Sequence, residues 1–159
     1  MRPLATEDLD QFHALLTQPG VRRYLLDDEV IPRERTQSFI DTSIASFASN
    51  DYGLWGATEK DDGVLVGFCG FWLFHDPPRL ELLYGLRDDC RGRGYATEMA
   101  AAMIRYGFEA LRFDRIEAST DAPNTASIAV MERAGMAFFK RELCGGRDTV
   151  YYAISAPLR

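Results

Sequence analysis

The sequence predicts a mixed α/β fold with one central, largely antiparallel sheet of six or seven strands, flanked by about four helices. Three observations carry this prediction. Two helical segments precede the long strands, short polar turns join consecutive strands, and a glycine-bearing turn at residues 90–98 joins one strand to a long helix. Strands and helices do not alternate regularly, which argues against a doubly wound parallel sheet.

The N-terminal third is expected to be mainly helical. Residues 1–4 are at most a short edge strand. Thr6 followed by two acids is typical of a helix start, and Pro19-Gly20 is expected to end that helix, with a short turn over residues 21–26. A second helix is expected from Pro32 or Thr36 to residues 50–51. Its predicted apolar face consists of Phe39, Ile40, Ile44 and Phe47.

The middle of the chain reads as strands and one long helix. Residues 52–58 and 64–74 form a predicted hairpin around a polar turn, and residues 80–86 form the next strand. The helix after the glycine-bearing turn repeats apolar residues at steps of three and four. These residues are Ala96, Met99, Ala100, Met103, Ile104, Gly107, Phe108 and Leu111.

The C-terminal part predicts a strand, a helix and two closing strands. The first strand covers residues 115–120, and the helix covers residues 124–134 and ends at Gly135, a residue suited to a left-handed cap. Residues 136–143 and 149–154 are the closing strands. Together the segments form one expected domain over residues 1–159.

Composition narrows the class of protein. The chain has 159 residues and a formal net charge of −6, which argues against a nucleic-acid-binding protein. Its three cysteines have no paired spacing, so neither a disulfide framework nor a metal site is expected. No apolar run has the length of a membrane helix, and the N-terminus does not resemble a signal peptide, so we expect a cytoplasmic protein without membrane partners.

The turn at residues 90–98 has the chemistry of an anion site. It places Gly92 and Gly94, which accept positive φ and let a ligand approach the backbone, before the free N–H groups of a helix N-terminus. Arg91 and Arg93 add positive charge. The dinucleotide fingerprint is not met, because Thr97 stands where the third glycine is required, and the chain has no P-loop.

A more specific pattern runs through this turn. Arg91-x-x-Gly94-x-Ala96 resembles the pyrophosphate loop of the GNAT superfamily of acyl-CoA N-acyltransferases, and residues 92–98 look like the version in the ribosomal-protein N-acetyltransferases (RimJ/RimL type). Residues 81–86 resemble the preceding strand of that branch, although Leu83 replaces the usual glycine before the tyrosine. The expected fold is then the splayed GNAT sheet.

A second motif lies about 30 residues downstream. Alone, residues 124–135 predict a helix capped by Asn124, with Ile128 and Met131 in the core. The spacing of Asn124, Ser127, Met131 and Gly135 also resembles the helix that lies beside the acyl-CoA arm in GNAT enzymes, with Met136 replacing the family's usual phenylalanine.

The resemblance implies an acyl-CoA-dependent N-acetyltransferase. Such an enzyme transfers the acetyl group of acetyl-CoA to a primary amine, on a protein N-terminus or a small molecule, by direct attack in a ternary complex without a metal. The carried-over donor-binding residues are Leu82, Leu83, Tyr84, Gly85, Leu86, Arg91, Gly92, Arg93, Gly94, Tyr95, Ala96, Thr97, Asn124, Ser127 and Met131. Gly85 is the expected place of a bulge whose N–H polarises the thioester carbonyl.

The sequence constrains the general acid and the general base less than the donor-binding residues. Glu81 is a carboxylate in an apolar strand and is our candidate base, directly or through a water. The other interpretation places it toward solvent, or paired with Arg79 or another neighbour. Many GNAT enzymes have a tyrosine acid where this chain has Met131, so Ser127 is the candidate acid. Strand alternation puts Glu81 and Tyr84 on opposite faces, and we therefore do not assign both to one cleft.

Several alternatives stay open at this point. His75 reads as a solvated loop residue that could instead face the acceptor, and Cys90 as a bystander thiol whose pKa nearby positive charge could lower. The acids at residues 27–29 could attract an amine but read more simply as a solvated charge run. The donor could be another acyl-CoA such as succinyl-CoA, or the chain could be a non-catalytic acyl-CoA sensor. A homodimer is common among similar proteins.

Overall fold

The computed structural model describes residues 1–59 and 62–157. Within these ranges the elements are β1 (Arg2–Pro3), α1 (Leu9–Leu16), α2 (Pro19–Leu25), α3 (Arg33–Asn50), β2 (Leu54–Thr58), β3 (Leu65–Phe74), β4 (Arg79–Leu86), α4 (Tyr95–Glu109), β5 (Arg115–Asp121), α5 (Thr125–Arg133), β6 (Ala137–Cys144) and β7 (Arg147–Ser155). Two short 3₁₀ helices, Thr6–Asp8 and Asp88–Cys90, precede α1 and α4.

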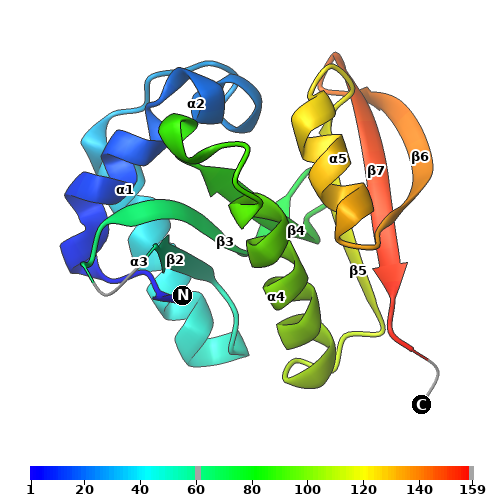
Figure 1. Ribbon diagram of the computed structural model, residues 1–159, viewed down its shortest axis with the longest axis horizontal. Coiled ribbons are helices and arrows are strands. Elements are labelled where there is room, and N and C mark those ends of the chain that lie inside the picture. The colour runs from blue at the N-terminus through cyan, green and yellow to red at the C-terminus, as the bar shows by residue number, and fades with distance from the viewer. Residues whose placement is uncertain (60–61, 158–159) are drawn as a thin grey trace.

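The strands form two antiparallel sheets with the orders β1-β2-β3-β4 and β5-β7-β6. Strands β4 and β5 pack against each other but share no ladder pairing among the described residues, so the sheet divides between them. Figure 1 shows this division: α1, α2 and α3 lie with the first sheet, and α5 lies with β5, β6 and β7. The mixed, antiparallel class predicted from the sequence is confirmed, and the splay falls directly after β4.

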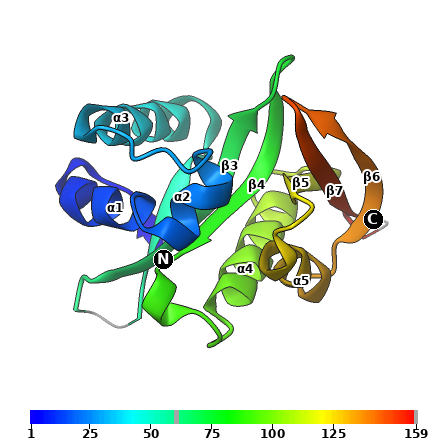
Figure 2. The same ribbon diagram turned by 90° about the horizontal axis from the view of Figure 1, so that it is seen from above.

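The helices cover opposite sides of the first sheet. In Figure 2, α1, α2 and α3 lie on one side of β3 and β4, whereas α4 and α5 lie on the other. Two apolar clusters occupy the two sides: Phe12, Ile40 and Phe68 belong to the one under α1 and α3, and Leu82 and Met99 belong to the one under α4. Each helix therefore buries one apolar stripe against the sheet.

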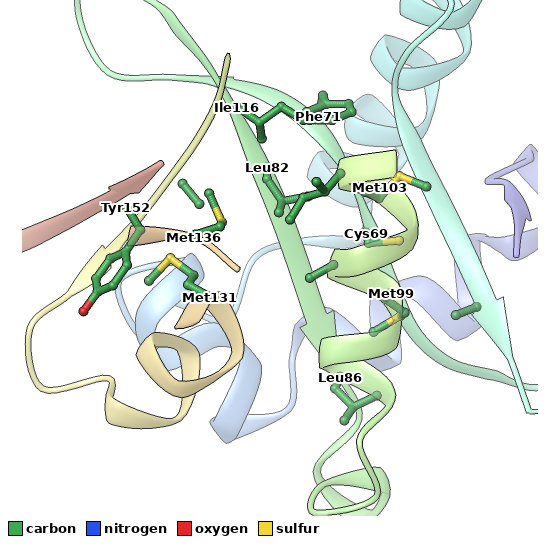
Figure 3. Packing of buried hydrophobic residues seen from close by; sticks show 14 of the residues in the cluster. Cys69, Phe71, Leu82, Leu86, Met99, Met103, Ile116, Met131, Met136 and Tyr152 are labelled. Atoms are coloured by element: carbon green, nitrogen blue, oxygen red, sulfur yellow. The ribbon is translucent and has the colours of Figure 1, made fainter. Parts of the chain in front are cut away.

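The core under α4 extends to the second sheet. Figure 3 shows Leu82, Leu86 and Phe71 of the first sheet facing Met99 and Met103 of α4, while Ile116 of β5 and Tyr152 of β7 continue the cluster. Because sulfur-containing side chains are flexible, methionines suit the irregular gap between two diverging sheets. This shared core holds the two sheets in one domain although the backbone ladder is broken between them.

Two local predictions in the N-terminal third are wrong. The first helix ends at Leu16, before Pro19-Gly20, but the residues expected to form a turn over 21–26 belong largely to helix α2. This helix begins at Pro19 because proline is tolerated at the first helical position and the carbonyl of Gln18 accepts from the backbone of Val21 and Arg22. Ile44 on α3 is 43% exposed.

The buried face of α3 contains two hydroxyl groups in place of part of the predicted apolar stripe. Thr36 Oγ1 lies 2.8 Å from His13 Nδ1, and Ser43 Oγ accepts from the backbone N–H of Leu54 at 2.7 Å. Because each hydroxyl has a hydrogen-bond partner, both can be buried without a large desolvation cost.

Gly85 has a different role from the one predicted. The pairing of β4 with β3 runs without a shift from Leu86 to Arg79, so this ladder has no bulge at Gly85. A Cβ atom at Gly85 would lie 2.4 Å from Cε1 of Phe68. The glycine is required because the phenyl ring of Phe68 packs directly on the strand backbone.

Candidate active site

A cavity of about 770 Å³ opens where the two sheets diverge. Its walls come from β4, β5, α5, the turn before α4, the hairpin between β6 and β7, and α2 with the residues that follow it. This volume falls in the range of small-molecule sites. The cavity brings together the glycine-bearing turn, most of the second motif and Glu81, which the sequence places far apart.

The turn before α4 forms one end of the cavity. Gly92 and Gly94 have φ values of 74° and 82°, and a Cβ atom at either position would have no heavy atom within 4 Å. Gly94 is the N-cap of α4, whose first-turn N–H groups carry the positive end of the helix dipole. The lining residues of this turn are Arg91, Gly92, Gly94, Tyr95, Ala96 and Thr97. The predicted anion site therefore faces an open space.

Arg93 does not join this group. Its guanidinium donates to Glu59 Oε1 at 2.6 Å and lies over the ring of Tyr95, and it does not line the cavity. The Arg93 side chain therefore lies outside the cavity wall, and its assignment to the donor site stays a prediction.

Strand β4 forms the long wall. Its residues Leu82, Leu83, Tyr84, Gly85 and Leu86, which the sequence assigned to donor binding, line the cavity. One edge of β4 pairs with β3, whereas the edge toward β5 has no ladder partner in the described residues. A free strand edge offers N–H and C=O groups to an extended, amide-bearing ligand.

Helix α5 forms the opposite wall. Asn124 caps it as predicted: its Oδ1 accepts from the backbone N–H of Ser127 at 3.3 Å, and its Nδ2 donates to Thr120 Oγ1 at 2.9 Å. Both Asn124 and Ser127 line the cavity.

Met131 is absent from the cavity wall. It is 1% exposed and packs beside Met136 and Tyr152, as Figure 3 shows. Two turns into α5, this face of the helix lies on the second sheet instead of the cavity. The core interpretation of Met131 is confirmed, and its assignment to the donor site is wrong.

Tyr84 bridges the two walls. Its hydroxyl lies 2.8 Å from Ser127 Oγ and also donates to the Ser127 carbonyl at 3.0 Å. Burial raises the pKa of Tyr84 to about 12, an effect that the hydrogen bond to Ser127 offsets only in part. The phenol is therefore protonated at neutral pH and serves as a hydrogen-bond donor to Ser127.

Glu81 is buried with both oxygens engaged. The residue is 2% exposed; Oε1 lies 2.8 Å from His75 Nε2, and Oε2 accepts from Ser119 Oγ at 2.6 Å. Glu81 therefore neither faces solvent nor pairs with Arg79; its partners are His75 and Ser119, as the alternative of another neighbouring partner allowed. The carboxylate instead belongs to a hydrogen-bonded cluster on the cavity wall.

Glu81 and Tyr84 both line this cavity, which corrects the expectation that they cannot share a cleft. Alternation along β4 holds: Leu82 and Tyr84 pack with the core under α4, and Leu83 packs with the core under α1 and α3. The cavity wraps around the free edge of β4, so side chains from both faces reach it.

His75 was expected to be a solvated loop residue, and this expectation is wrong. Its side chain is 18% exposed, its backbone has a φ of 69°, and its Nδ1 lies 3.4 Å from Cys144 Sγ. The ring also packs against Tyr151 at 5.7 Å between ring centroids. Burial and a hydrogen bond with Cys144 raise the pKa of Tyr151.

Sequence reasoning gave no functional role to three residues of this cluster: Ser119, Cys144 and Tyr151. Each lies in an ordinary strand segment without a motif, and the cluster forms only when β4, β5 and the last hairpin meet. The one available signal was His75 in its Asp-Pro-Pro loop, a polar segment between two apolar strands.

Other polar candidates are accounted for by local partners. Cys90 is buried, with Sγ 3.6 Å from Asp89 Oδ1, and does not line the cavity. At the cavity mouth, Arg147 bonds Asp27 at 3.0 Å and Asp121 at 3.1 Å, so Asp27 faces a cation of this chain.

Within residues 1–59 and 62–157, no group of three or more His, Cys, Asp and Glu side chains could hold a metal ion. No helix in that part of the chain has the length and apolar character needed to cross a membrane.

The chain is similar to several known proteins. The family model described as "Acetyltransferase (GNAT) domain" matches residues 1–137. The uncharacterized protein YkkB of Bacillus subtilis is 30% identical over 139 residues, which cover 84% of this chain and 80% of YkkB. A GNAT-family acetyltransferase from Bacillus anthracis superposes with a TM-score of 0.80 at 26% identity, covering 97% of this chain and 92% of that one.

A more distant likeness concerns the fold alone. RimL, a ribosomal L7/L12 α-N-protein acetyltransferase solved with coenzyme A, has a TM-score of 0.80 at 16% identity and covers 97% of this chain and 92% of its own.

Proposed function

Because the chain belongs to the GNAT acetyltransferase family and is thus an acyl-CoA-dependent acetyltransferase, we propose that it transfers acetyl from acetyl-CoA to a primary amine by direct attack in a ternary complex. One observation carries this proposal: a single cavity joins the anion-binding turn to the buried carboxylate of Glu81. A phosphate-bearing donor and an amine that must lose a proton can therefore meet there.

The donor is held along the length of the cavity. Backbone N–H groups at the start of α4, reached past Gly92 and Gly94, bind the pyrophosphate, and Arg91 adds charge. The pantetheine amides pair with the free edge of β4 over Leu82–Leu86, and α5 closes the other side through Asn124 and Ser127. Acetyl-CoA is a donor of the size and chemistry that this cavity fits.

The proton transfers divide between the two clusters. Glu81 takes the proton of the attacking amine, directly or through a water, while His75 and Ser119 fix its orientation. The departing thiolate receives a proton relayed through Ser127: the serine hydroxyl gives up its proton and takes one from the hydrogen-bonded phenol of Tyr84, which solvent then reprotonates. In many similar enzymes the proton donor is a tyrosine at the position that corresponds to Met131 of this chain. Here Ser127 and Tyr84 together take that role.

The acceptor is a protein N-terminus or a small amine. The turn at 92–98 favours the RimJ/RimL-like branch, and the fold likeness to RimL is compatible with it. We further predict a cytoplasmic enzyme, with a homodimer as the form to test first.

The experiment is release of the free CoA thiol from acetyl-CoA with three acceptor classes: small primary amines, peptides with a free N-terminus, and N-blocked peptides that contain lysine. Release with the first or second class is expected. Faster release from succinyl-CoA would overturn the acetyl specificity. Binding without release from any acyl-CoA would overturn catalysis in favour of a sensor.

A further inference from the structure

Cys144 differs from the other two cysteines in its surroundings. Cys69 and Cys90 are buried, and neither lines the cavity. Cys144 is half-buried at the end of β6, lines the cavity, and has a histidine nitrogen within hydrogen-bond distance. It is therefore the cysteine placed to meet a ligand in the cavity.

The thiol is the first member of a linked series of groups. Cys144 Sγ lies 3.4 Å from His75 Nδ1, His75 Nε2 lies 2.8 Å from Glu81 Oε1, and Ser119 donates to Glu81 Oε2 at 2.6 Å. A neutral imidazole that donates from Nε2 to the carboxylate leaves Nδ1 free to accept the thiol proton. Nucleophile, base and orienting carboxylate are thus in sequence, as nucleophilic catalysis requires.

The thiol, the imidazole and the carboxylate come from separate parts of the fold. His75 comes from the segment after β3, Glu81 from β4, and Cys144 from the end of β6. His75 keeps a left-handed backbone with φ of 69°, a conformation that is unfavourable for a residue with a Cβ atom. A residue in this conformation whose side chain contacts two reactive groups is typical of a functional site. Tyr151 hydrogen-bonds Cys144 from β7, the strand paired with β6, and this contact would also stabilise a thiolate.

We propose that Cys144 is a second acyl acceptor, whose thiolate takes the acetyl group of bound acetyl-CoA to give S-acetyl-Cys144 when no amine is present. The donor site is the one in the proposed function, on which this inference rests. Cys144 Sγ shares the cavity with the turn that would hold the donor's pyrophosphate.

Transfer of the acetyl group from CoA to Cys144 needs no oxidant and no metal. His75 Nδ1 takes the thiol proton, and Cys144 Sγ forms a bond to the thioester carbonyl carbon. The bond from that carbon to the CoA sulfur breaks, and the CoA thiolate receives the proton from the imidazolium. One thioester replaces another, so excess acetyl-CoA drives acylation. An amine that attacks S-acetyl-Cys144 later restores the thiol.

The test uses the full chain with acetyl-CoA, a phosphine reductant and no amine, followed by intact-mass and peptide mass measurements. We expect one acetyl group on Cys144 that neutral hydroxylamine removes, with Cys69 and Cys90 unmodified as internal controls. His75→Gln keeps an N–H donor for Glu81 but no base, and should slow acylation at least tenfold and shift its pH dependence toward that of an unassisted thiol.

Three results would overturn the proposal: acetyl on lysine or the N-terminus only, equal labelling of all three cysteines, or an unchanged rate and pH profile in His75→Gln. Two further measurements distinguish this failure from failure of the proposed function. One is calorimetric titration with acetyl-CoA, and the other is CoA release that depends on an added amine. A chain that binds acetyl-CoA and acetylates an amine, yet forms no S-acetyl-Cys144, contradicts this inference alone. A chain that does not bind acetyl-CoA contradicts both.

Discussion

Ser119 Oγ donates to Glu81 Oε2 at 2.6 Å across the boundary between β5 and β4, the two strands at which the sheet divides. This hydrogen bond links sheets that share no backbone ladder there. It also fixes one oxygen of a carboxylate whose other oxygen contacts His75. The break in the sheet thus creates the cavity, and side chains instead of backbone groups hold its chemical centre together.

Glu81→Gln should lower kcat by about 10²–10⁴-fold, because an amide cannot accept the amine proton. The Kd for acetyl-CoA should stay within about twofold, since the donor is held by the turn before α4 and by the β4 backbone. Steady-state kinetics with calorimetry measure both quantities. Arg79→Gln, an exposed position on the same strand, is the matched control. Native activity in Glu81→Gln would exclude this carboxylate as the base.

Gly85→Ala should reduce the free energy of unfolding by about 1–3 kcal/mol, because the new Cβ atom would lie 2.4 Å from Phe68 Cε1. Phe68→Leu removes that ring edge, so the alanine should cost less in the Phe68→Leu background. Urea titration of the four proteins gives the coupling energy. Strictly additive effects would mean that Gly85 is not constrained by Phe68.

Tyr84→Phe should make the protein less sensitive to alkali. Burial raises the pKa of Tyr84 from 10.0 to about 12 in the folded state. Above pH 10 the unfolded chain loses this proton and the folded chain keeps it, so the free energy of unfolding falls as pH rises toward 12. At about 1.4 kcal/mol per pKa unit, this loss approaches about 3 kcal/mol.

The measurement is the difference between native protein and Tyr84→Phe in urea titrations at several pH values from 8 to about 12. Other groups with raised pKa values, such as the Cys69 thiol, are present in both proteins and cancel in the difference. A difference that does not change with pH would contradict the burial of the phenol.

Much of the fold could be predicted because its local signals agree with one another. The apolar period of α4, the cap at Asn124 and the left-handed Gly135 are properties of short segments, and the structure has all three. Where two structures were compatible with one segment, the prediction failed: residues 21–26 can form a turn after Pro19-Gly20 or continue a helix that begins there.

The site was harder to predict because its members come from different segments. The turn with Gly92 and Gly94 is contiguous and could be found from its residues alone. The cluster of His75, Glu81, Ser119 and Cys144 depends on which strands meet at the splay, and periodicity does not contain that information. The prediction of a bulge at Gly85 failed for a related reason. Glycine permits a bulge and also close contact with an aromatic ring, and only the position of Phe68 distinguishes the two.

The most direct test of the central claim is calorimetric titration of acetyl-CoA into native protein, Gly94→Val and Gly63→Val. Both glycines have positive φ, 82° and 73°, with open space around the Cβ position, so valine should cost each protein about the same 1–2 kcal/mol of stability. Only Gly94 lines the cavity. We predict binding by native protein and Gly63→Val, with affinity at least tenfold weaker in Gly94→Val. Equal affinity in all three proteins, or no binding by native protein, would contradict a donor site at the N-terminus of α4.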